Sequence, residues 1–266
     1  GHFMKRNILV TGAGGGIGRY IHEQLGGVGF TRQSGGLDQF KNKSFDVIIH
    51  CAWNYMPTRL VTNLNLNQYY YDNVLLTQEL LKIPHDYFVF FSTVDIYPGG
   101  RQPHPEDEII FADSVRSIYG TTKLISETMV SSYPGRFLIL RPTSLLGRQM
   151  RKNTLLRLLE DSRPSLTLDG GSMYNLIHYS DVLGFILEAV DFGETGIFNL
   201  ASTKSMTLGE IAKVTGKNVV FGDHHYEVGN VVNHKAVKIF SGLNKTTGEV
   251  LDQFISQMFK NKNRTD

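Results

Sequence analysis

The sequence predicts an α/β fold, with a Rossmann-type doubly wound, mostly parallel sheet and a smaller mixed C-terminal lobe. Continuous apolar runs at 45–52, 87–93 and 136–146 suit strands that are buried on both faces of a sheet. Segments with helical periodicity at 67–82 and 117–133 follow the first two of these runs. A glycine-rich turn also follows the first apolar stretch of the chain, so the pattern is that of repeated βαβ units.

The remaining elements follow in order along the chain. The first strand is expected at 6–12 and its helix at 18–25, and a second strand ends near Arg32. After Arg148 the pattern loosens into helices and short strands. The expected helices are 153–162, 180–192, 207–216 and 246–260, and the expected strands are 165–168, 196–200 and 218–222.

Two domains are expected from this change of pattern. Residues 4–148 are predicted to form a dinucleotide-binding Rossmann domain, and residues 149–266 mainly a substrate-binding lobe over the carboxyl edge of the sheet. The boundary is soft, so segments of the second half could rejoin the first domain. Residues 1–3, before Met4, are interpreted as a cloning remnant.

Composition excludes several classes of function. The formal net charge of +2 is spread over 266 residues, so neither a nucleic-acid nor a membrane surface is expected. The only cysteine is Cys51, which excludes an internal disulfide and fits a reducing compartment. With no membrane-length apolar run and no signal-peptide pattern, a cytoplasmic location is expected. No set of Cys, His and carboxylate residues has metal-ligand spacing.

The stretch TGAGGGIG, at 11–18, is a candidate dinucleotide site. Gly12, Gly15 and Gly18 have the spacing G-x-x-G-x-x-G between a strand and a helix. Glycines there allow a tight turn and close approach to a pyrophosphate, and the helix N-terminus offers free N–H groups. Gly16 and Ile17, inside the motif, are expected to contact the cofactor as well.

Arg32 bears on the choice of cofactor. The second strand ends in GFTRQSGG, where no Asp or Glu is available to bond the ribose 2′-hydroxyl of NAD. A guanidinium suits a 2′-phosphate, so NADP(H) is favoured, with NAD(H) left open. A solvated Arg32, or one that stacks on adenine, is the alternative.

Tyr119 and Lys123, in YGTTK, are four residues apart and therefore share one face of a helix. They are either a proton-transfer pair or two side chains that only share that face. As a pair, the ammonium would stabilise a tyrosinate and lower the pKa of Tyr119.

With these motifs the chain resembles the extended short-chain dehydrogenases/reductases, the group of nucleotide-sugar epimerases and dehydratases. TGAGGGIG resembles the TGxxGxxG motif of this family, DVIIHCA its fourth strand, and Asn73 the asparagine of the next helix. FFSTVDIYP resembles SSxxVYG, and YGTTK matches Tyr-x-x-x-Lys. LRPTSLLG, NLIHYSDVLGFIL and GIFNLAS resemble the LRPxNVYGP, FIHVDDxA and YNIGSG stretches, in the same order.

The resemblance implies roles for single residues. Tyr119 would be the acid/base, Lys123 would lower its pKa and hold the nicotinamide ribose, and Thr93 would hydrogen-bond the reacting oxygen. A surface helix pair becomes the less favoured reading of Tyr119 and Lys123. Further cofactor contacts are expected from Cys51, Ala52, Trp53, Asn73 and Pro142, although burial in the core is the simpler account of Trp53.

The sequence also departs from the family. The stretch from Arg32 to Phe45 leaves little room for the usual third strand and its helix, as in the shorter reductases of the family. Asp95 stands where some dehydratases carry an acid, but a loop-capping aspartate is equally compatible. RPTSLLG lacks the usual asparagine and aromatic residue. Thr143, Ser144 and His178 are therefore only tentative substrate contacts, together with Asp95.

Three functions fit these observations. The first is an enzyme that uses NADP(H) to reduce a keto group of a nucleotide-activated sugar, with a 4-keto-6-deoxy sugar as the expected substrate. The second is a 4-epimerase or 4,6-dehydratase that retains NAD(P). The third is a non-catalytic NAD(P)-binding sensor, which fold alone does not exclude. The resemblance also implies a homodimer through a four-helix bundle formed by the helices that contain Asn73 and Tyr119.

Overall fold

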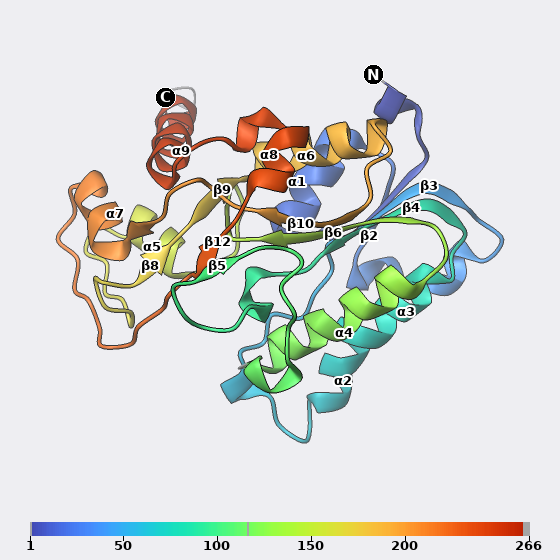
Figure 1. Cartoon of the computed structure of the whole chain (residues 1–266), viewed down its shortest axis with the longest axis horizontal. Coiled ribbons are helices and arrows are strands. Elements are labelled where there is room, and N and C mark those ends of the chain that lie inside the picture. The colour runs from blue at the N-terminus through green and yellow to red at the C-terminus, as the bar shows by residue number, and fades with distance from the viewer. Residues whose placement is uncertain (1, 116, 263–266) are drawn as a thin grey trace.

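The computed structural model describes residues 2–115 and 117–262. Its centre is a six-stranded parallel sheet in the order β2-β1-β3-β4-β6-β10 (Figure 1), which confirms the predicted doubly wound α/β fold. The strands are β1 (Ile8–Thr11), β2 (Val28–Phe30), β3 (Phe45–His50), β4 (His85–Phe91), β6 (Arg136–Pro142) and β10 (Gly196–Leu200).

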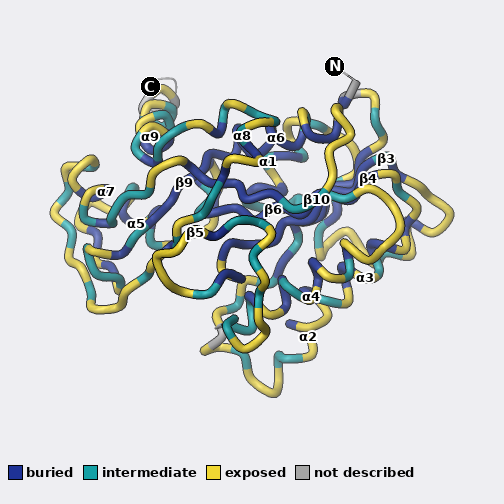
Figure 2. The backbone as a smooth tube through the Cα atoms, viewed as in Figure 1, coloured by how far each residue is buried: buried dark blue, intermediate teal, exposed yellow. Residues whose placement is uncertain are grey.

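Helices cover both faces of this sheet (Figure 1). One face carries α1 (Gly16–Leu25), α6 (Tyr179–Asp191) and α8 (His234–Ile239), and the other carries α2 (Leu66–Tyr70), α3 (Leu76–Leu81) and α4 (Ile118–Ser132). Along β1, Ile8 and Val10 pack toward the α1 and α6 side of the sheet, and Leu9 packs toward the α3 and α4 side. Figure 2 shows the strands as buried segments between these layers, which is why their sequences lack polar alternation.

The helix expected at 67–82 is interrupted by a π-helical segment, η5 (Tyr71–Leu75), between α2 and α3. The π-helical segment adds one residue per turn at this point. Asp72 and Asn73, both inside η5, are buried polar residues. Helical periodicity predicted the helix correctly but gave no sign of the interruption.

Two short 3-10 helices, η2 (Arg32–Ser34) and η3 (Leu37–Phe40), occupy the connection between β2 and β3. As expected from its length, this part of the chain holds no third strand or crossover helix. Phe40 anchors this connection to the core on one face of the sheet, where its ring packs edge-on against Phe30 and Phe45.

The smaller lobe lies beyond the carboxyl ends of the strands and contains three two-stranded sheets, which pair β11 with β8, β12 with β5, and β7 with β9. The remaining strands and α-helices are β5 (Pro103–His104), β7 (Ser144–Leu146), α5 (Thr154–Glu160), β8 (Met173–Tyr174), β9 (Leu176–His178), β11 (Met206–Thr207), α7 (Leu208–Thr215), β12 (Asn230–Val231) and α9 (Thr247–Lys262). The remaining 3-10 helices are η1 (His2–Lys5), η4 (Thr58–Leu60), η6 (Val94–Ile96), η7 (Ala112–Ser114) and η8 (Ser241–Leu243).

Three strand predictions need correction. The segments 165–168 and 218–222 are not strands, since only isolated bridges such as Ser165–Val220 join this region to the chain beside it. The single strand expected at 136–146 is two strands, because the chain leaves the large sheet at Thr143 and β7 pairs with β9 instead. Within the described residues, no helix is both long and apolar enough to cross a membrane.

Candidate active site

A cavity of about 380 Å³ lies where β1, β3, β4 and β6 end. This is the edge at which doubly wound sheets bind their ligands. From the predicted site, its wall contains Gly12, Gly15, Gly16, Ile17, Gly18, Cys51, Ala52, Thr93, Tyr119, Lys123, Pro142 and Thr143. Predicted residues that are not in this wall are Arg32, Trp53, Asn73, Asp95, Ser144 and His178.

The glycine loop forms one end of the cavity. Gly12 has φ +68°, and a Cβ there would lie 2.8 Å from the backbone nitrogen of Ala52. A Cβ at Gly18 would lie 2.2 Å from the carbonyl oxygen of Gly12. A Cβ at Gly15, by contrast, would meet no atom within 4 Å. Two of the three motif glycines therefore permit close packing, and the third leaves open space.

That open space adjoins the N-terminus of α1. Gly15 is the N-cap of α1, and no side chain caps the helix there. The first N–H groups of the helix therefore have no side-chain acceptor and lie beside the cavity that Gly15 and Gly16 line. A phosphate at this position would accept hydrogen bonds from these groups and gain from the helix dipole.

The ends of β1 and β3 are held together by Thr11 and His50. The Thr11 hydroxyl accepts hydrogen bonds from the backbone nitrogens of Cys51 (3.0 Å) and Ala52 (3.1 Å). Its own hydrogen is therefore directed to His50 Nδ1 at 2.7 Å, and His50 Nε2 donates to Thr77 at 2.9 Å. Burial, reinforced by the positive charge of Lys123, lowers the pKa of His50 to about 3, so the ring stays neutral.

Asn73 anchors the loop that follows β3. Its side-chain oxygen accepts from the Asn54 amide at 2.7 Å, and its side-chain nitrogen donates to the Asn54 carbonyl at 3.0 Å. The next residue, Tyr55, lines the cavity. Asn73 thus supports the cavity from behind, and its buried position in the π-helical segment makes this reach possible.

Three polar side chains from two elements converge on the cavity. Thr93 follows β4 and caps η6, where its hydroxyl oxygen accepts a hydrogen bond from the Asp95 amide at 3.1 Å. Ser117 caps α4 by accepting from the Gly120 amide, and α4 carries Tyr119 and Lys123 one turn apart. Thr93, Tyr119 and Lys123 all line this cavity, so the reactive groups expected from the sequence are together.

Lys123 is buried below Tyr119. Its ammonium donates to the Phe91 carbonyl and lies 3.5 Å from the centre of the Trp53 ring. Trp53 itself is a buried core residue that packs against Phe90 and Tyr119, so it supports Lys123 from behind the cavity wall. The cation–π contact compensates in part for removing the ammonium from water.

The expected lowering of the Tyr119 pKa by Lys123 is wrong for this arrangement. Burial raises the pKa of Tyr119 well above its usual value, and the nearby Tyr55 and Asp95 raise it further, whereas Thr93 lowers it. Burial also lowers the pKa of Lys123, against the opposing effects of Cys51 and Glu127. Desolvation is the largest influence on the pKa of Tyr119, and Lys123 is not among the groups that shift it.

Asp95 stands at the edge of the site. It is accessible to solvent, yet the surrounding protein shields it enough that desolvation raises the pKa of its carboxyl, against a contact with Thr93. Its charge also raises the pKa of Tyr119 and of two tyrosines of the small lobe, Tyr174 and Tyr226. The Asp95 carboxylate therefore acts electrostatically on Tyr119 and on both of these tyrosines.

Arg32 lies at the end of β2, outside the cavity wall. One of its guanidinium nitrogens lies 2.7 Å from the Asp72 carboxylate, which also accepts from Asn54 and Gln68. Arg32 is largely exposed while Asp72 is buried in η5. Asp72 thus orients an otherwise exposed guanidinium.

Some residues of the cavity wall are not in the set expected from the sequence. They are Tyr55, Phe91, Ser92, Leu145, Met150, Arg151, Lys152, Asn153 and Tyr179. The Arg151 guanidinium lies 4.5 Å from the centre of the Tyr55 ring and so joins the two sides of the opening. The adjacent basic residues in GRQMRKN were the sequence feature that could have indicated Arg151 and Lys152 as site residues. His178 is buried and caps α6, and Tyr179 beside it lines the cavity.

Within the described residues, no group of three or more His, Cys, Asp or Glu side chains could hold a metal ion. The cavity wall instead supplies hydroxyls, an ammonium and backbone N–H groups. Such groups bind phosphates and carbonyl oxygens.

Comparison with protein families identifies the class of the chain. Residues 28–201 match the model of the NAD dependent epimerase/dehydratase family, and the chain belongs to this family. The resemblance to extended short-chain dehydrogenases/reductases is thereby confirmed. No curated protein matches the sequence at a significant level.

Solved structures show the same fold. MoeE5 in complex with UDP-glucose and NAD is 20% identical, with a TM-score of 0.78 over 96% of this chain and 99% of that chain. The dTDP-4-dehydrorhamnose reductase of Bacillus anthracis str. Ames in complex with NADP is 17% identical, with a TM-score of 0.77 over 95% and 99%. The UDP-glucuronic acid 4-epimerase of Bacillus cereus in complex with UDP-glucuronic acid and NAD is 20% identical, with a TM-score of 0.73 over 95% and 99%.

Proposed function

We propose that the protein is an NADP(H)-dependent oxidoreductase that reduces a keto group of a nucleotide-activated sugar, with a 4-keto-6-deoxy sugar as the expected substrate. The observation that carries this proposal is the meeting of Thr93, Tyr119 and Lys123 at a cavity that starts at the glycine loop. A sensor that only binds a dinucleotide has no need of a hydroxyl, a phenol and a buried ammonium at one point.

The glycine loop and the first turn of α1 would hold the pyrophosphate of the cofactor, and Lys123 the nicotinamide ribose. When bound, the nicotinamide supplies the hydride. Cys51, Ala52 and Pro142 line the cavity beside these groups and would contact the cofactor. Trp53 and Asn73 would support the site without touching the cofactor. Trp53 would hold Lys123 in place, and Asn73 would hold Asn54.

The protonation state of Tyr119 supports reduction. A phenol carries its proton at neutral pH and can donate it to the keto oxygen of a substrate. Thr93 Oγ1 accepts from the Asp95 amide, and in the proposed complex the Thr93 hydroxyl would donate its hydrogen to the same substrate oxygen. Oxidation of a hydroxyl would first require removal of the Tyr119 proton, which burial opposes.

Basic side chains at the opening support a phosphorylated substrate. Arg151 and Lys152 line the cavity on the small-lobe side, and in the described part of the chain neither forms an ion pair with a carboxylate. The diphosphate of a nucleotide sugar would supply the missing negative charge. In this proposal, residues 149–266 supply most of the substrate contacts and residues 4–148 most of the cofactor contacts.

Arg32 supports NADP(H) over NAD(H). Asp72 holds one nitrogen of its guanidinium, which leaves the other nitrogens able to contact a 2′-phosphate. Solved structures of the same fold hold NADP in one case and NAD in others, so the fold does not decide between the two cofactors. The preference for NADP(H) proposed for this chain rests on Arg32.

Asp95 favours a second candidate function, that of an epimerase or dehydratase that retains its cofactor. Removing water from a sugar requires an acid for the departing hydroxyl. A carboxyl whose pKa is raised by its surroundings, close to Tyr119, could supply that proton. Thr143, which lines the cavity, and Ser144 beside it would contact the sugar in either case.

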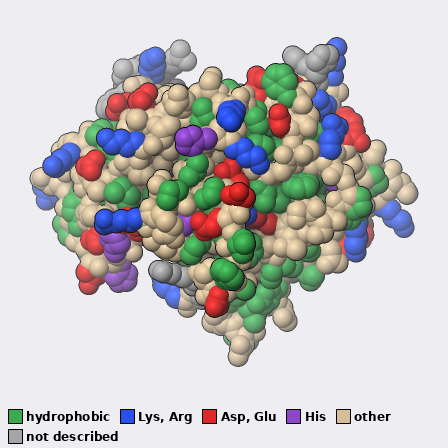
Figure 3. All heavy atoms as spheres, in the orientation of Figure 1, with side chains coloured by type: hydrophobic (Ala, Val, Ile, Leu, Met, Phe, Trp, Pro, Cys, Tyr) green, Lys and Arg blue, Asp and Glu red, His purple; other side chains and the backbone are tan. Residues whose placement is uncertain are grey.

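A homodimer is part of the proposal. Tyr70, Tyr71 and Leu75 on the α2–η5–α3 helix and Ile125 on α4 are exposed apolar residues on two neighbouring helices. On the face drawn in Figure 3, positive and negative side chains are intermixed, so no large area of one charge would repel a second copy there. Pairing of these two helices with those of a second copy would cover the apolar residues.

The test is a panel of 4-keto-6-deoxy sugar nucleotides with NADPH and NADH, following cofactor oxidation and product mass. Stoichiometric oxidation of NADPH with a product two mass units heavier is the expected result. A second panel, of sugar nucleotides that still carry their C4 and C6 hydroxyls, tests the alternatives: a mass loss of 18 without net change in the cofactor would identify a dehydratase, and an isomer of equal mass an epimerase. Cofactor binding without turnover of any substrate would favour the third hypothesis, a non-catalytic NAD(P)-binding sensor.

A further inference from the structure

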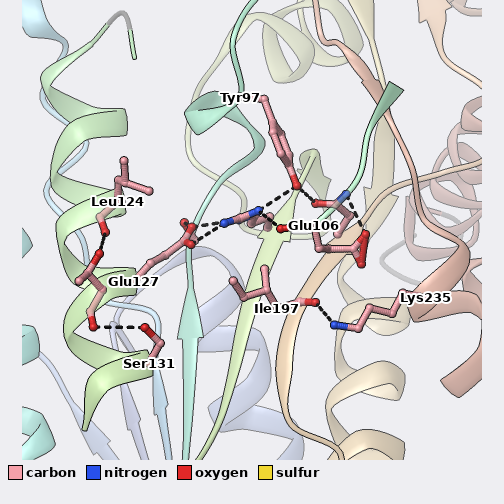
Figure 4. Close-up of polar contacts among 11 residues, drawn as sticks. Tyr97, Glu106, Leu124, Glu127, Ser131, Ile197 and Lys235 are labelled. Carbon is pink, nitrogen blue, oxygen red and sulfur yellow. Dashed lines mark hydrogen bonds and ion pairs between the residues drawn. The ribbon is translucent and has the colours of Figure 1, made fainter. Parts of the chain in front are cut away.

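A buried ion pair lies one helical turn beyond Lys123. Glu127 on α4 and Arg141 on β6 form two parallel hydrogen bonds, of 2.7 Å from Nη2 and 3.1 Å from Nε (Figure 4). Their side chains are only 5% and 4% exposed. Burying two charges costs about as much free energy as their attraction returns, so such a pair is weak evidence of a role in stability. Its contacts point to a different role.

Both members of the pair reach the turn that carries Thr93. Ser92, directly before Thr93, donates its hydroxyl hydrogen to Glu127 at 2.5 Å. At the other end of the turn, Arg141 donates to the Tyr97 hydroxyl at 3.0 Å, and this hydroxyl donates to Asn199 at 2.6 Å (Figure 4). The ion pair thus holds residues 92 and 97, on either side of the turn.

The turn between these two points is short. Its internal hydrogen bonds run from the Asp95 amide to Thr93 Oγ1 and from the Tyr97 amide to the Val94 carbonyl. The position of the Thr93 hydroxyl therefore depends on where Ser92 and Tyr97 are fixed. Because Glu127 belongs to the same helix as Tyr119 and Lys123, fixing the turn on Glu127 also fixes it relative to both.

We infer that the Glu127–Arg141 pair, acting through Ser92 and Tyr97, is the element that positions the Thr93 hydroxyl against Tyr119 and Lys123. Its importance for catalysis rests on the proposed function, but the mechanical link does not. Glu127, Arg141, Ser92 and Tyr97 are positioning residues that act through Thr93. Geometry of this kind matters because an error of about 1 Å in a reactive group can cost about 100-fold in rate.

Tyr97→Phe is the cleanest variant, because Tyr97 is not in the cavity wall and Phe keeps the ring. Its matched control is Tyr87→Phe, since Tyr87 is also buried and donates its hydroxyl to a distant carbonyl, that of Glu194. Ser92→Ala is the second variant. Its control is Ser172→Ala, because Ser172 is a buried serine that donates to the carboxylate of Asp169.

For the reductase reaction, we expect Tyr97→Phe and Ser92→Ala each to lower kcat about tenfold with little change in the KM for the cofactor. In a Thr93→Ala background each should cost less than about twofold, since the group that they position is gone. The two controls should keep kcat near wild type. Equal losses in both backgrounds, or losses no greater than in the controls, would overturn the inference.

Hydrogen exchange gives a test that needs no substrate. In Tyr97→Phe the amides of Asp95 and Tyr97 should exchange at least about tenfold faster than in Tyr87→Phe, while the amides of β4 keep their protection. If the wild type reduces none of the sugar nucleotides, the proposed function fails and this measurement alone decides the inference. Equal exchange in the two variants would then overturn it.

Discussion

The Arg32 guanidinium is held by the Asp72 carboxylate at 2.7 Å, between the end of β2 and the π-helical segment. Asp72 is buried and receives two further hydrogen bonds, so it is a fixed support and Arg32 is the exposed member. The pair sets one arginine at the place where a doubly wound sheet recognises the adenosine ribose of its cofactor.

Arg32→Asp should therefore weaken NADP binding by at least about tenfold, because two carboxylates would face the 2′-phosphate. NAD binding should be equal or better. Fluorescence titration of both reduced cofactors measures this, with Arg163→Asp, an exposed arginine of the small lobe, as the control. Unchanged NADP affinity in Arg32→Asp would remove Arg32 from the site.

Tyr119→Phe keeps the ring but removes the acidic oxygen. Turnover should fall by about 100-fold or more while cofactor binding survives, as expected for the loss of a positioned proton donor. Tyr133→Phe, beyond the end of the same helix, is the control. A variant that turns over at close to the wild-type rate would refute the assignment of Tyr119.

Asp95→Asn separates reduction from elimination. Reduction needs one proton, which Tyr119 supplies, so the rate of NADPH consumption at saturating substrate should fall by no more than about tenfold, or about 1.4 kcal/mol of barrier. A thermal melt checks that the variant is folded. A loss of several hundredfold in folded protein would show that Asp95 takes part in the chemistry and would favour the dehydratase or epimerase.

Gly18→Ala tests the packing of the glycine loop. The added methyl would overlap the carbonyl oxygen of Gly12, so the variant should lose about 1–3 kcal/mol of unfolding free energy and most of its cofactor affinity. Gly36→Ala is the matched control, because a Cβ there meets nothing within 4 Å and the backbone is extended. Urea unfolding and cofactor titration are the measurements. Equal stability and equal cofactor affinity in the two variants would contradict the close approach of Gly18 to the Gly12 carbonyl oxygen.

His50 predicts how stability depends on pH. Its folded pKa of about 3 is below the unfolded value of 6.5, so the unfolded chain binds more protons between these pH values. The stabilisation is complete above pH 6.5 and is lost as the pH falls toward 3. Between pH 7 and pH 5 the wild type should lose about 2 kcal/mol more unfolding free energy than His50→Gln. Parallel pH profiles of the two proteins would argue against a neutral, buried His50.

Much of the fold could be predicted because it depends on local pattern. The apolar runs of β3, β4 and β6 are continuous because helices cover both of their faces, and that signal is visible in the sequence. The small lobe gives a weaker signal, since β8 and β12 are two residues long and pair with distant segments. The π-helical segment also escaped prediction, since periodicity does not encode one added residue.

The site likewise has a part that local sequence patterns predict and a part that they do not. The residues of the glycine loop and of YGTTK lie together because fixed spacing places them on one turn or one helix. The contribution of Arg151 and Tyr55 depends on two loops that meet across the opening, which no local pattern specifies. The pKa of Tyr119 could not be inferred from spacing either, because desolvation depends on everything packed around the phenol.

The position of β10 has a consequence for how the protein is made. Residues 196–200 complete the large sheet beside β6, more than fifty residues after β6 has ended. A ribosome that has released only the first 148 residues has therefore produced a sheet with β6 as an open edge, whose unpaired N–H and C=O groups can accept a foreign strand. Synthesis passes through the residues of the small lobe before that edge closes, so the nascent chain is exposed to mispairing throughout this interval.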